Sequence, residues 1–164
     1  MSLRITFPWN EQAYIQSGMI ANRYKMRYSW KQVIGYAFIG VAIYGALKAV
    51  DRQDYTLLYL GTIFTLYWYF LRPILHRQRL KSFFKKEPVK NATMEFVFNT
   101  HGVRINGNMI PWSHISRVIV ASSGFLLERP EGYPYIPATA FERDEDVETF
   151  LVLVEEQEIE VKRV

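Results

Sequence analysis

Two long apolar runs separated by a short polar tip constrain this chain more than any other feature. The first run is Val33–Val50, whose one charge is Lys48, and the second is Tyr55–Leu71, which has none. Each approaches the ~20 residues that an α-helix needs to cross ~30 Å of hydrocarbon, where only helices and closed barrels satisfy the backbone. With the tip at residues 51–54, the pattern predicts a transmembrane helical hairpin.

A buried helical hairpin inside a soluble domain is the alternative interpretation, and the mean hydropathy of −0.07 for the whole chain favours it. Neither run, however, has the amphipathic stripe of a helix on a soluble surface. Aromatic side chains also gather near the ends of the runs, as at membrane interfaces. These are Trp30, Tyr36, Tyr55, Tyr59, Trp68 and Tyr69. The membrane interpretation is therefore preferred.

The basic residues beside the runs predict the orientation. Four Lys or Arg lie in residues 23–31 and seven in residues 72–90, whereas the tip balances Lys48 and Arg52 with two aspartates. Short segments rich in Lys and Arg stay in the cytoplasm. We therefore expect a multi-pass inner-membrane protein with both termini cytoplasmic. Lys48 is expected to extend to the outer interface.

The charge differs sharply between the two parts of the chain. Residues 1–90 carry 14 basic against 4 acidic side chains, a balance of +10, whereas residues 91–164 carry 6 against 12, a balance of −6. A nucleic-acid-binding domain needs a basic patch on its folded surface. We therefore expect no nucleic-acid partner, and expect the lipid bilayer and an unidentified protein as partners.

No chemical motif stands out. The chain has no cysteine, and His76, His101 and His114 lack metal-ligand spacing. His76 is interpreted as a charged or solvated residue at the membrane rim. The sequence thus predicts no catalytic residue, no cofactor and no metal, and a protein that is not an enzyme.

The remaining pattern predicts elements on either side of the hairpin. Residues 1–32 hold a strand at 3–7 and a helix at 11–26 capped by Asn10, and residues 72–90 form a basic amphipathic connector. Residues 91–164 alternate as short strands, with a type I′ hairpin at Asn106-Gly107 and a final helix at 144–156. The expected strands cover 94–98, 103–105, 109–112, 115–121, 125–128 and 135–137. The predicted fold class is an α+β membrane protein, with the transmembrane hairpin at 33–71 followed by a small antiparallel β domain.

In the tail that follows the two runs, six positions stand out, namely Gly102, Trp112, Phe125, Pro137, Phe141 and Phe150. With the hairpin, this tail resembles the YcxB-like family of bacterial membrane proteins. The resemblance implies a pleckstrin-homology-like (PH-like) cytoplasmic domain at residues 91–164. Members often carry basic residues where this chain has Ala138, Thr139 and Ala140. The six matching positions are interpreted as structural anchors, not as a ligand site.

Small residues on both runs predict close helix packing. The stripe is Gly35, Ala42, Ala46 and Ala49 on the first run, facing Gly61 and Thr65 on the second. Packing within the hairpin is the preferred use of the stripe, and a homodimer is the alternative.

Two functions remain open. The first is a non-enzymatic membrane protein whose cytoplasmic domain is an interaction or regulatory module. The alternative is an immunity protein that neutralises a membrane-acting toxin.

Overall fold

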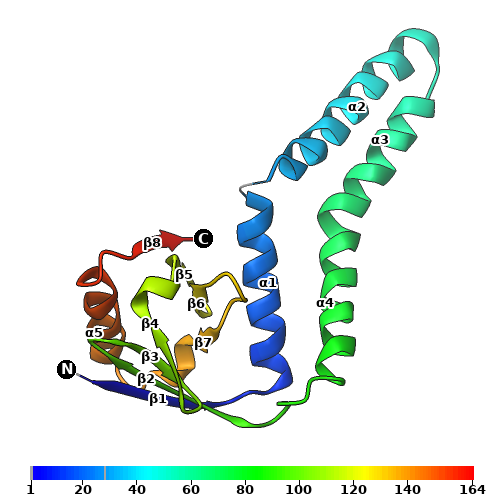
Figure 1. Cartoon of the computed structure of the whole chain (residues 1–164). Coiled ribbons are helices and arrows are strands. Elements are labelled where there is room, and N and C mark those ends of the chain that lie inside the picture. Colours follow the sequence, from blue (N-terminus) through cyan, green and yellow to red (C-terminus); the bar gives the residue numbers. More distant parts are fainter. Residues whose placement is uncertain (1, 28) are drawn as a thin grey trace. The chain divides into compact units, whose positions relative to one another are not determined.

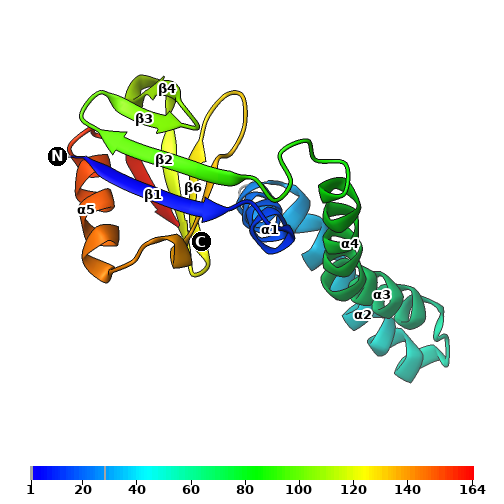
Figure 2. The same cartoon turned by 90° about the horizontal axis from the view of Figure 1, so that it is seen from below.

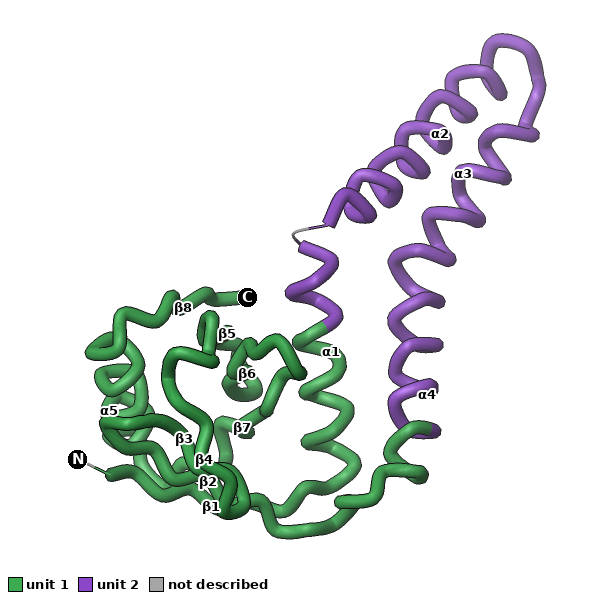
Figure 3. The backbone as a smooth tube through the Cα atoms, viewed as in Figure 1, with its two compact units in different colours: residues 1–21, 83–164 green, residues 22–82 purple. Residues whose placement is uncertain are grey.

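The chain forms two compact units, of which the first contains both chain ends. The computed structural model describes residues 2–27 and 29–164. Residues 1–21 and 83–164 form what we call the β unit, and residues 22–82 form the helical unit (Figure 3). The sequence analysis assigned residues 1–32 and residues 91–164 to separate parts of the protein. In the structure the N-terminal strand lies in the same sheet as strands from the tail.

The first sheet, sheet A, pairs that N-terminal strand with three strands of the tail. Its order is β1-β2-β3-β4, and every pair is antiparallel. The strands are β1 (Leu3–Pro8), β2 (Thr93–Asn99), β3 (Gly102–Ile105) and β4 (Asn108–Pro111). Figure 2 shows β1 along the open side of β2. The predicted tight turn between β3 and β4 is confirmed, because Asn106 and Gly107 both have positive φ.

The second sheet, sheet B, has the order β7-β6-β5-β8. Its strands are β5 (Arg117–Ala121), β6 (Gly124–Glu128), β7 (Tyr135–Pro137) and β8 (Glu160–Arg163). The predicted antiparallel pairing is confirmed except at β8, an unpredicted strand that runs parallel to β5. β8 has four residues with three charges, a pattern that gives little strand signal before its partner is known.

The core of the β unit lies among the two sheets and the last helix, α5 (Asp144–Glu155). Phe96 and Phe98 of sheet A, with Val118 and Leu127 of sheet B, are fully buried in it. Two 3₁₀ turns, η2 (Trp112–His114) and η3 (Ala138–Ala140), follow β4 and β7. The i, i+3, i+4 and i+7 spacing of Val147, Phe150, Leu151 and Val154 predicts an apolar face for this helix, which is confirmed. Phe150 and Val154 are buried there, with Leu153 beside them.

The first helix, α1 (Glu11–Arg27), begins at a side-chain cap, as the sequence predicted. Asn10 Oδ1 accepts a hydrogen bond from the Ala13 backbone N–H at 2.9 Å. Its first turns belong to the β unit, where Ala13, Ile15 and Ile20 are buried. The apolar side of these turns of α1 therefore packs within the β unit.

The helical unit is built on a packed helix pair (Figure 1). It comprises α2 (Lys31–Arg52), α3 (Thr56–Leu66), the π-helical turn η1 (Tyr67–Leu71) and most of α4 (Arg72–Phe84). Gly61 lies against the Ala42 backbone, and Gly45 lies against the backbone at Leu57 and Leu58. The small-residue contact was thus correctly predicted at Ala42 and Gly61. Gly45 is buried in place of Ala46, which is exposed.

The π-helical turn shortens the second regular helix. Pro73 has no N–H, so it cannot donate the usual helical hydrogen bond to the Tyr69 carbonyl oxygen. Just before it, the Arg72 N–H donates to the Tyr67 carbonyl oxygen, five residues back, as in a π-helix. As a result α3 has 11 residues. Among the described residues, one helix, α2, is long and apolar enough to cross a membrane by length and composition. The predicted α+β fold class is confirmed, and one of the two predicted membrane spans has the length and composition of a spanning helix.

Candidate functional site

Most of the predicted anchor residues lie in the core of the β unit. Phe125, Phe141 and Phe150 form mutual ring contacts with centroids 5.2 to 5.9 Å apart. Trp112 is 6% exposed, stacks on Phe98, and donates from Nε1 to the Asn99 carbonyl oxygen at 2.8 Å. These rings fill space between the sheets and α5, and Phe141 alone among them is half-buried.

The other two anchors lie where backbones come close. A Cβ at Gly102 would clash with the Ile110 carbonyl oxygen on the neighbouring strand β4. Pro137 is buried at the end of β7, opposite Gly124. Both residues therefore support the sheets.

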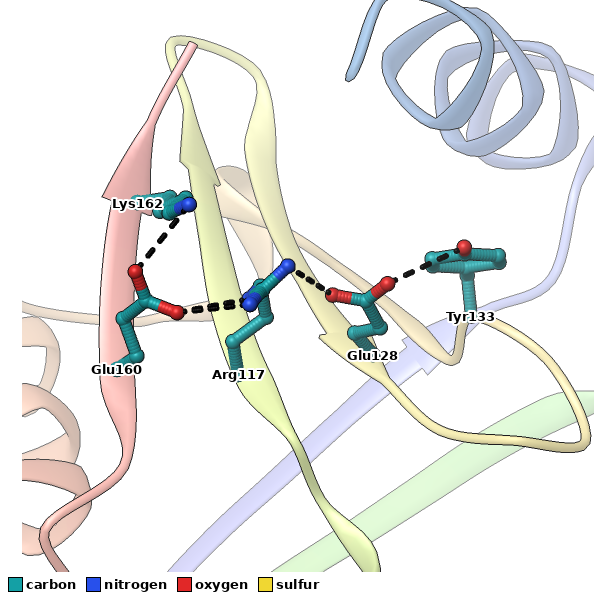
Figure 4. Close-up of polar contacts among 5 residues, drawn as sticks. All are labelled: Arg117, Glu128, Tyr133, Glu160 and Lys162. Atoms are coloured by element: carbon teal, nitrogen blue, oxygen red, sulfur yellow. Dashed lines mark hydrogen bonds and ion pairs between the residues drawn. The ribbon is translucent and has the colours of Figure 1, made fainter. Parts of the chain in front are cut away.

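A row of charged side chains crosses the other face of sheet B (Figure 4). Arg117 lies between two carboxylates that are its register partners, with Nη2 2.8 Å from Glu160 and Nη1 3.3 Å from Glu128. Lys162 Nζ adds a contact of 3.2 Å to Glu160, and the Tyr133 hydroxyl donates to Glu128 at 3.4 Å. The hydrogen bond from Lys162, followed by the charge of Arg117, lowers the pKa of Glu160. This row holds the parallel edge strand β8 to β5.

Tyr135 lies on the same face of sheet B and is almost fully buried. Its phenol donates to the Ser123 carbonyl oxygen at 2.6 Å, and it lies 2.9 Å from Gln16 Oε1 of α1. Burial raises the pKa of the phenol, and the Ser123 contact offsets part of the rise. The neutral phenol therefore joins helix and sheet.

The β unit has a groove of about 570 Å³ between sheet A and the loop before β7, within the ~300–1,000 Å³ of ligand sites. We call it the β groove. Its lining is mainly apolar, and Met109 of β4, one of its members, is 42% exposed. Trp9, Met94, Ile105, Tyr133 and Pro134 also line it.

Arg129 supplies the cationic group of the β groove. Its Nη2 pairs with Glu131 at 2.8 Å, while Nε is buried and has no hydrogen-bond partner among the described residues. A buried N–H left without an acceptor costs about 1–3 kcal/mol. An occupant of the groove with a carboxylate or carbonyl oxygen would therefore find a donor there.

The helical unit holds a second cavity, of about 240 Å³, which we call the basic pocket. Arg72, His76 and Arg79 of α4 line it, with Trp68 of η1 and Asn22 of α1. The Arg72 guanidinium carbon is 4.2 Å from the Trp68 ring centroid, within cation–π range. Arg72 Nη1 and His76 Nε2 are buried without a partner among the described residues.

Sequence analysis missed this pocket and misjudged His76. His76 was interpreted as a charged or solvated rim residue, whereas the structure half-buries it and encloses its Nε2. The available signal was the spacing of Arg72, His76 and Arg79 at i, i+4 and i+7, which places three nitrogen donors on one helix face.

Within the described residues, no three His, Asp or Glu side chains lie together in a way that could hold a metal ion. Comparison with protein-family models finds no matching family, and comparisons with curated proteins and with solved structures find no similar chain.

Proposed function

We propose that this chain is a non-enzymatic membrane protein of the bacterial inner membrane, whose helical unit spans the bilayer as a two-helix hairpin. The main support is the apolar surface of that unit. In α2 only 17% of the apolar window is buried, far less than in the core helix of a soluble protein. Large apolar side chains stay exposed on both helices, among them Val50 at 87% and Ile43, Leu47, Ile63 and Phe70. A soluble monomer rarely exposes more than a few hundred Å² of contiguous apolar surface.

The division of the chain supports two crossings. Residues on both sides of the helical unit, 1–21 and 83–164, belong to one folded β unit. A segment inserted in one folded unit starts and ends on the same side of a bilayer, so it crosses an even number of times. Since α2 is long enough for one crossing, the return must use α3 and the residues after it.

The lengths fit such a pair. The 22 residues of α2 extend about 33 Å at ~1.5 Å per residue. Residues 56–75, which continue as helix through the π-helical turn, extend about 30 Å by the same measure. The one charge among them, Arg72, lines the basic pocket. Four Lys or Arg lie in residues 23–31 and seven in residues 72–90, which favours cytoplasmic termini.

We assign the β unit the role of a cytoplasmic interaction or regulatory module of PH-like type. Three features favour a protein partner. The β groove is apolar, it offers the unpaired Arg129 Nε, and the tail carries −6. The η3 turn at Ala138–Ala140 adds no positive charge that would attract anionic lipid. Glu87 and Glu131 also line the groove, so the occupant that suits it is a partner segment with apolar side chains and a carbonyl oxygen for Arg129 Nε.

Labelling with an impermeant thiol reagent in intact cells tests the membrane topology. The chain has no native cysteine, so single cysteines at Ser2, Gln53 and Glu160 report without background. We expect labelling at Gln53 and protection at the other two positions. Labelling at Glu160 without labelling at Gln53 would overturn the proposed topology.

Site-specific photocrosslinking in the native membrane tests the partner. A photoreactive residue at Met109, inside the β groove, should trap a protein, and one at Val152, 51% exposed on α5 and outside the groove, should not. Arg129→Gln should reduce the Met109 product. Equal products at both positions would contradict the groove as the docking site. A toxin as the trapped partner would favour the immunity role.

A further inference from the structure

We propose that the basic pocket of the helical unit binds a phosphate group. The pocket lies at the end of the second apolar run, where the charge pattern changes from none to strongly basic. Its donors come from two helices, since α4 supplies two arginines and a histidine and α1 supplies Asn22.

Unused hydrogen-bonding capacity is the first reason for a ligand. Arg72 Nη1 is buried, and among the described residues no acceptor lies within reach of it. His76 Nε2, one helical turn further along α4, is also buried and has no hydrogen-bond partner among the described residues. A guanidinium has five N–H donors and no acceptor, so its enclosed N–H requires an oxygen from outside the pocket. The imidazole is a second donor when Nε2 carries the proton.

The charge of the helical unit favours an anionic group as the source of the oxygen that would accept from Arg72. None of the residues lining the pocket is Asp or Glu. In residues 22–82 the acidic side chains are Asp51 and Asp54, and both belong to the tip at the far end of the α2–α3 pair. Neither arginine therefore has a carboxylate of its own unit as a counter-ion. Arg79 is exposed, but Arg72 is half-buried, where an unpaired charge is costly.

The pocket is also held in shape before any ligand binds. Trp68 contacts the Phe38 ring of α2 with centroids 5.7 Å apart, and a Cβ at Gly35 would collide with its indole. Arg72 packs on the same indole, with its guanidinium carbon 4.2 Å from the Trp68 ring centroid. Trp68 belongs to the π-helical turn, and Arg72 follows the last residue of that turn. Such turns are frequent at functional sites.

Size and donor type favour phosphate over other anions. A cavity of about 240 Å³ is smaller than the ~300–1,000 Å³ of sites for drug-sized molecules. Planar guanidinium groups match the oxygens of phosphate in bidentate pairs. Two sources offer this group, the headgroup of an anionic phospholipid and free phosphate. Only the lipid source rests on the proposed membrane hairpin.

Binding measurements on the purified full-length chain in a non-ionic detergent test the proposal. One arm titrates inorganic phosphate, with chloride at equal ionic strength as the blank, and follows Trp fluorescence. The other arm adds phosphatidylglycerol or phosphatidylcholine and counts bound lipids by native mass spectrometry. Each arm compares the wild type with Arg72→Gln/Arg79→Gln and with the matched control Arg77→Gln/Lys81→Gln. The control removes the same charge from the same helix, at two positions that do not line the pocket.

We expect the pocket variant to bind at least tenfold more weakly than the wild type, and the control to stay within twofold. Arg72→Lys, which keeps the charge and loses the planar fork, should also weaken binding and serves if the double variant does not fold. Binding of phosphatidylglycerol alone identifies the lipid headgroup, and binding of inorganic phosphate identifies free phosphate. Equal loss in pocket and control variants, or no binding of either probe to the wild type, would overturn the proposal. The phosphate arm needs no bilayer, so it can succeed even when cysteine labelling refutes the hairpin.

Discussion

The phenol of Tyr135 lies 2.9 Å from the Gln16 side-chain oxygen, although 119 residues separate the two in sequence. Through this contact a helix at the start of the chain covers the outer face of sheet B, where Ile119 and Leu126 are also fully buried. The β unit thus has apolar layers on both faces of sheet B, and one of them depends on the N-terminal segment.

Alkaline pH should destabilise the β unit through Tyr135. Its folded pKa is raised above the ordinary value of 10.0 by burial, so folding is favoured while the phenol is neutral. That contribution is fully present below pH 10 and is lost as the pH rises towards the folded pKa. We expect the melting temperature of the wild type to fall more steeply above about pH 10 than that of Tyr135→Phe, which cannot ionise. Parallel curves for the two proteins would contradict this expectation.

Removing the Trp112 ring should severely weaken the β unit. Trp112→Ala loses a buried aromatic side chain and its hydrogen bond to Asn99, which costs about 3–5 kcal/mol for a buried large-to-small change. Hydrogen exchange of the β2 amides measures the loss. Trp30→Ala is the matched control, because Trp30 is 72% exposed and should change exchange by less than about 0.5 kcal/mol. Unchanged exchange in Trp112→Ala would show that the ring is not a core anchor.

The tail should not fold stably without the N-terminal segment. A fragment of residues 91–164 lacks β1, whose Ile5 and Phe7 are buried on Phe96, and lacks the α1 side chains that cover Tyr135. We expect weak β circular dichroism and no cooperative melting from this fragment. Fusing residues 2–21 to it through a flexible linker should restore a cooperative transition. A fragment that melts cooperatively by itself would show that β1 is dispensable.

Removing Lys162 should raise the pKa of Glu160 more than removing Arg117 does. The hydrogen bond from Lys162 is the largest influence that lowers this pKa below its ordinary 4.5, and Arg117 acts next by its charge. A lowered carboxyl pKa stabilises the folded state above pH 4.5 and loses that effect as the pH falls. Carboxyl-carbon NMR titrations of Lys162→Gln and Arg117→Gln give the two shifts. A larger rise in the Arg117 variant would reverse the assigned order.

Local patterns predicted most elements of this chain because each depended on nearby residues. The Asn106-Gly107 turn, the Asn10 cap and the apolar face of α5 are encoded within a few positions, and all three are confirmed. Sequence analysis failed where pairing is distant. β8 is defined by β5, some 40 residues earlier, and the pairing of its Glu160 with Arg117 appears only once the two strands lie side by side.

The basic pocket was missed for a different reason. Its basic residues were interpreted only as charges beside the membrane. The topology rule counts such charges and does not depend on the direction in which each side chain points. The helical phase of Arg72, His76 and Arg79 was present in the sequence, whereas the partner positions Asn22 and Met26 came only from the tertiary contact with α1.

The pairing of β1 with β2 also sets an order of events during synthesis. β1 is made before β2 and has no strand to join until Thr93–Asn99 has followed it, after the whole helical unit. During that interval the six residues of β1 are unpaired, and Ile5 and Phe7 lack the Phe96 side chain on which they pack in the folded β unit. Slower synthesis of residues 22–82 would lengthen the interval.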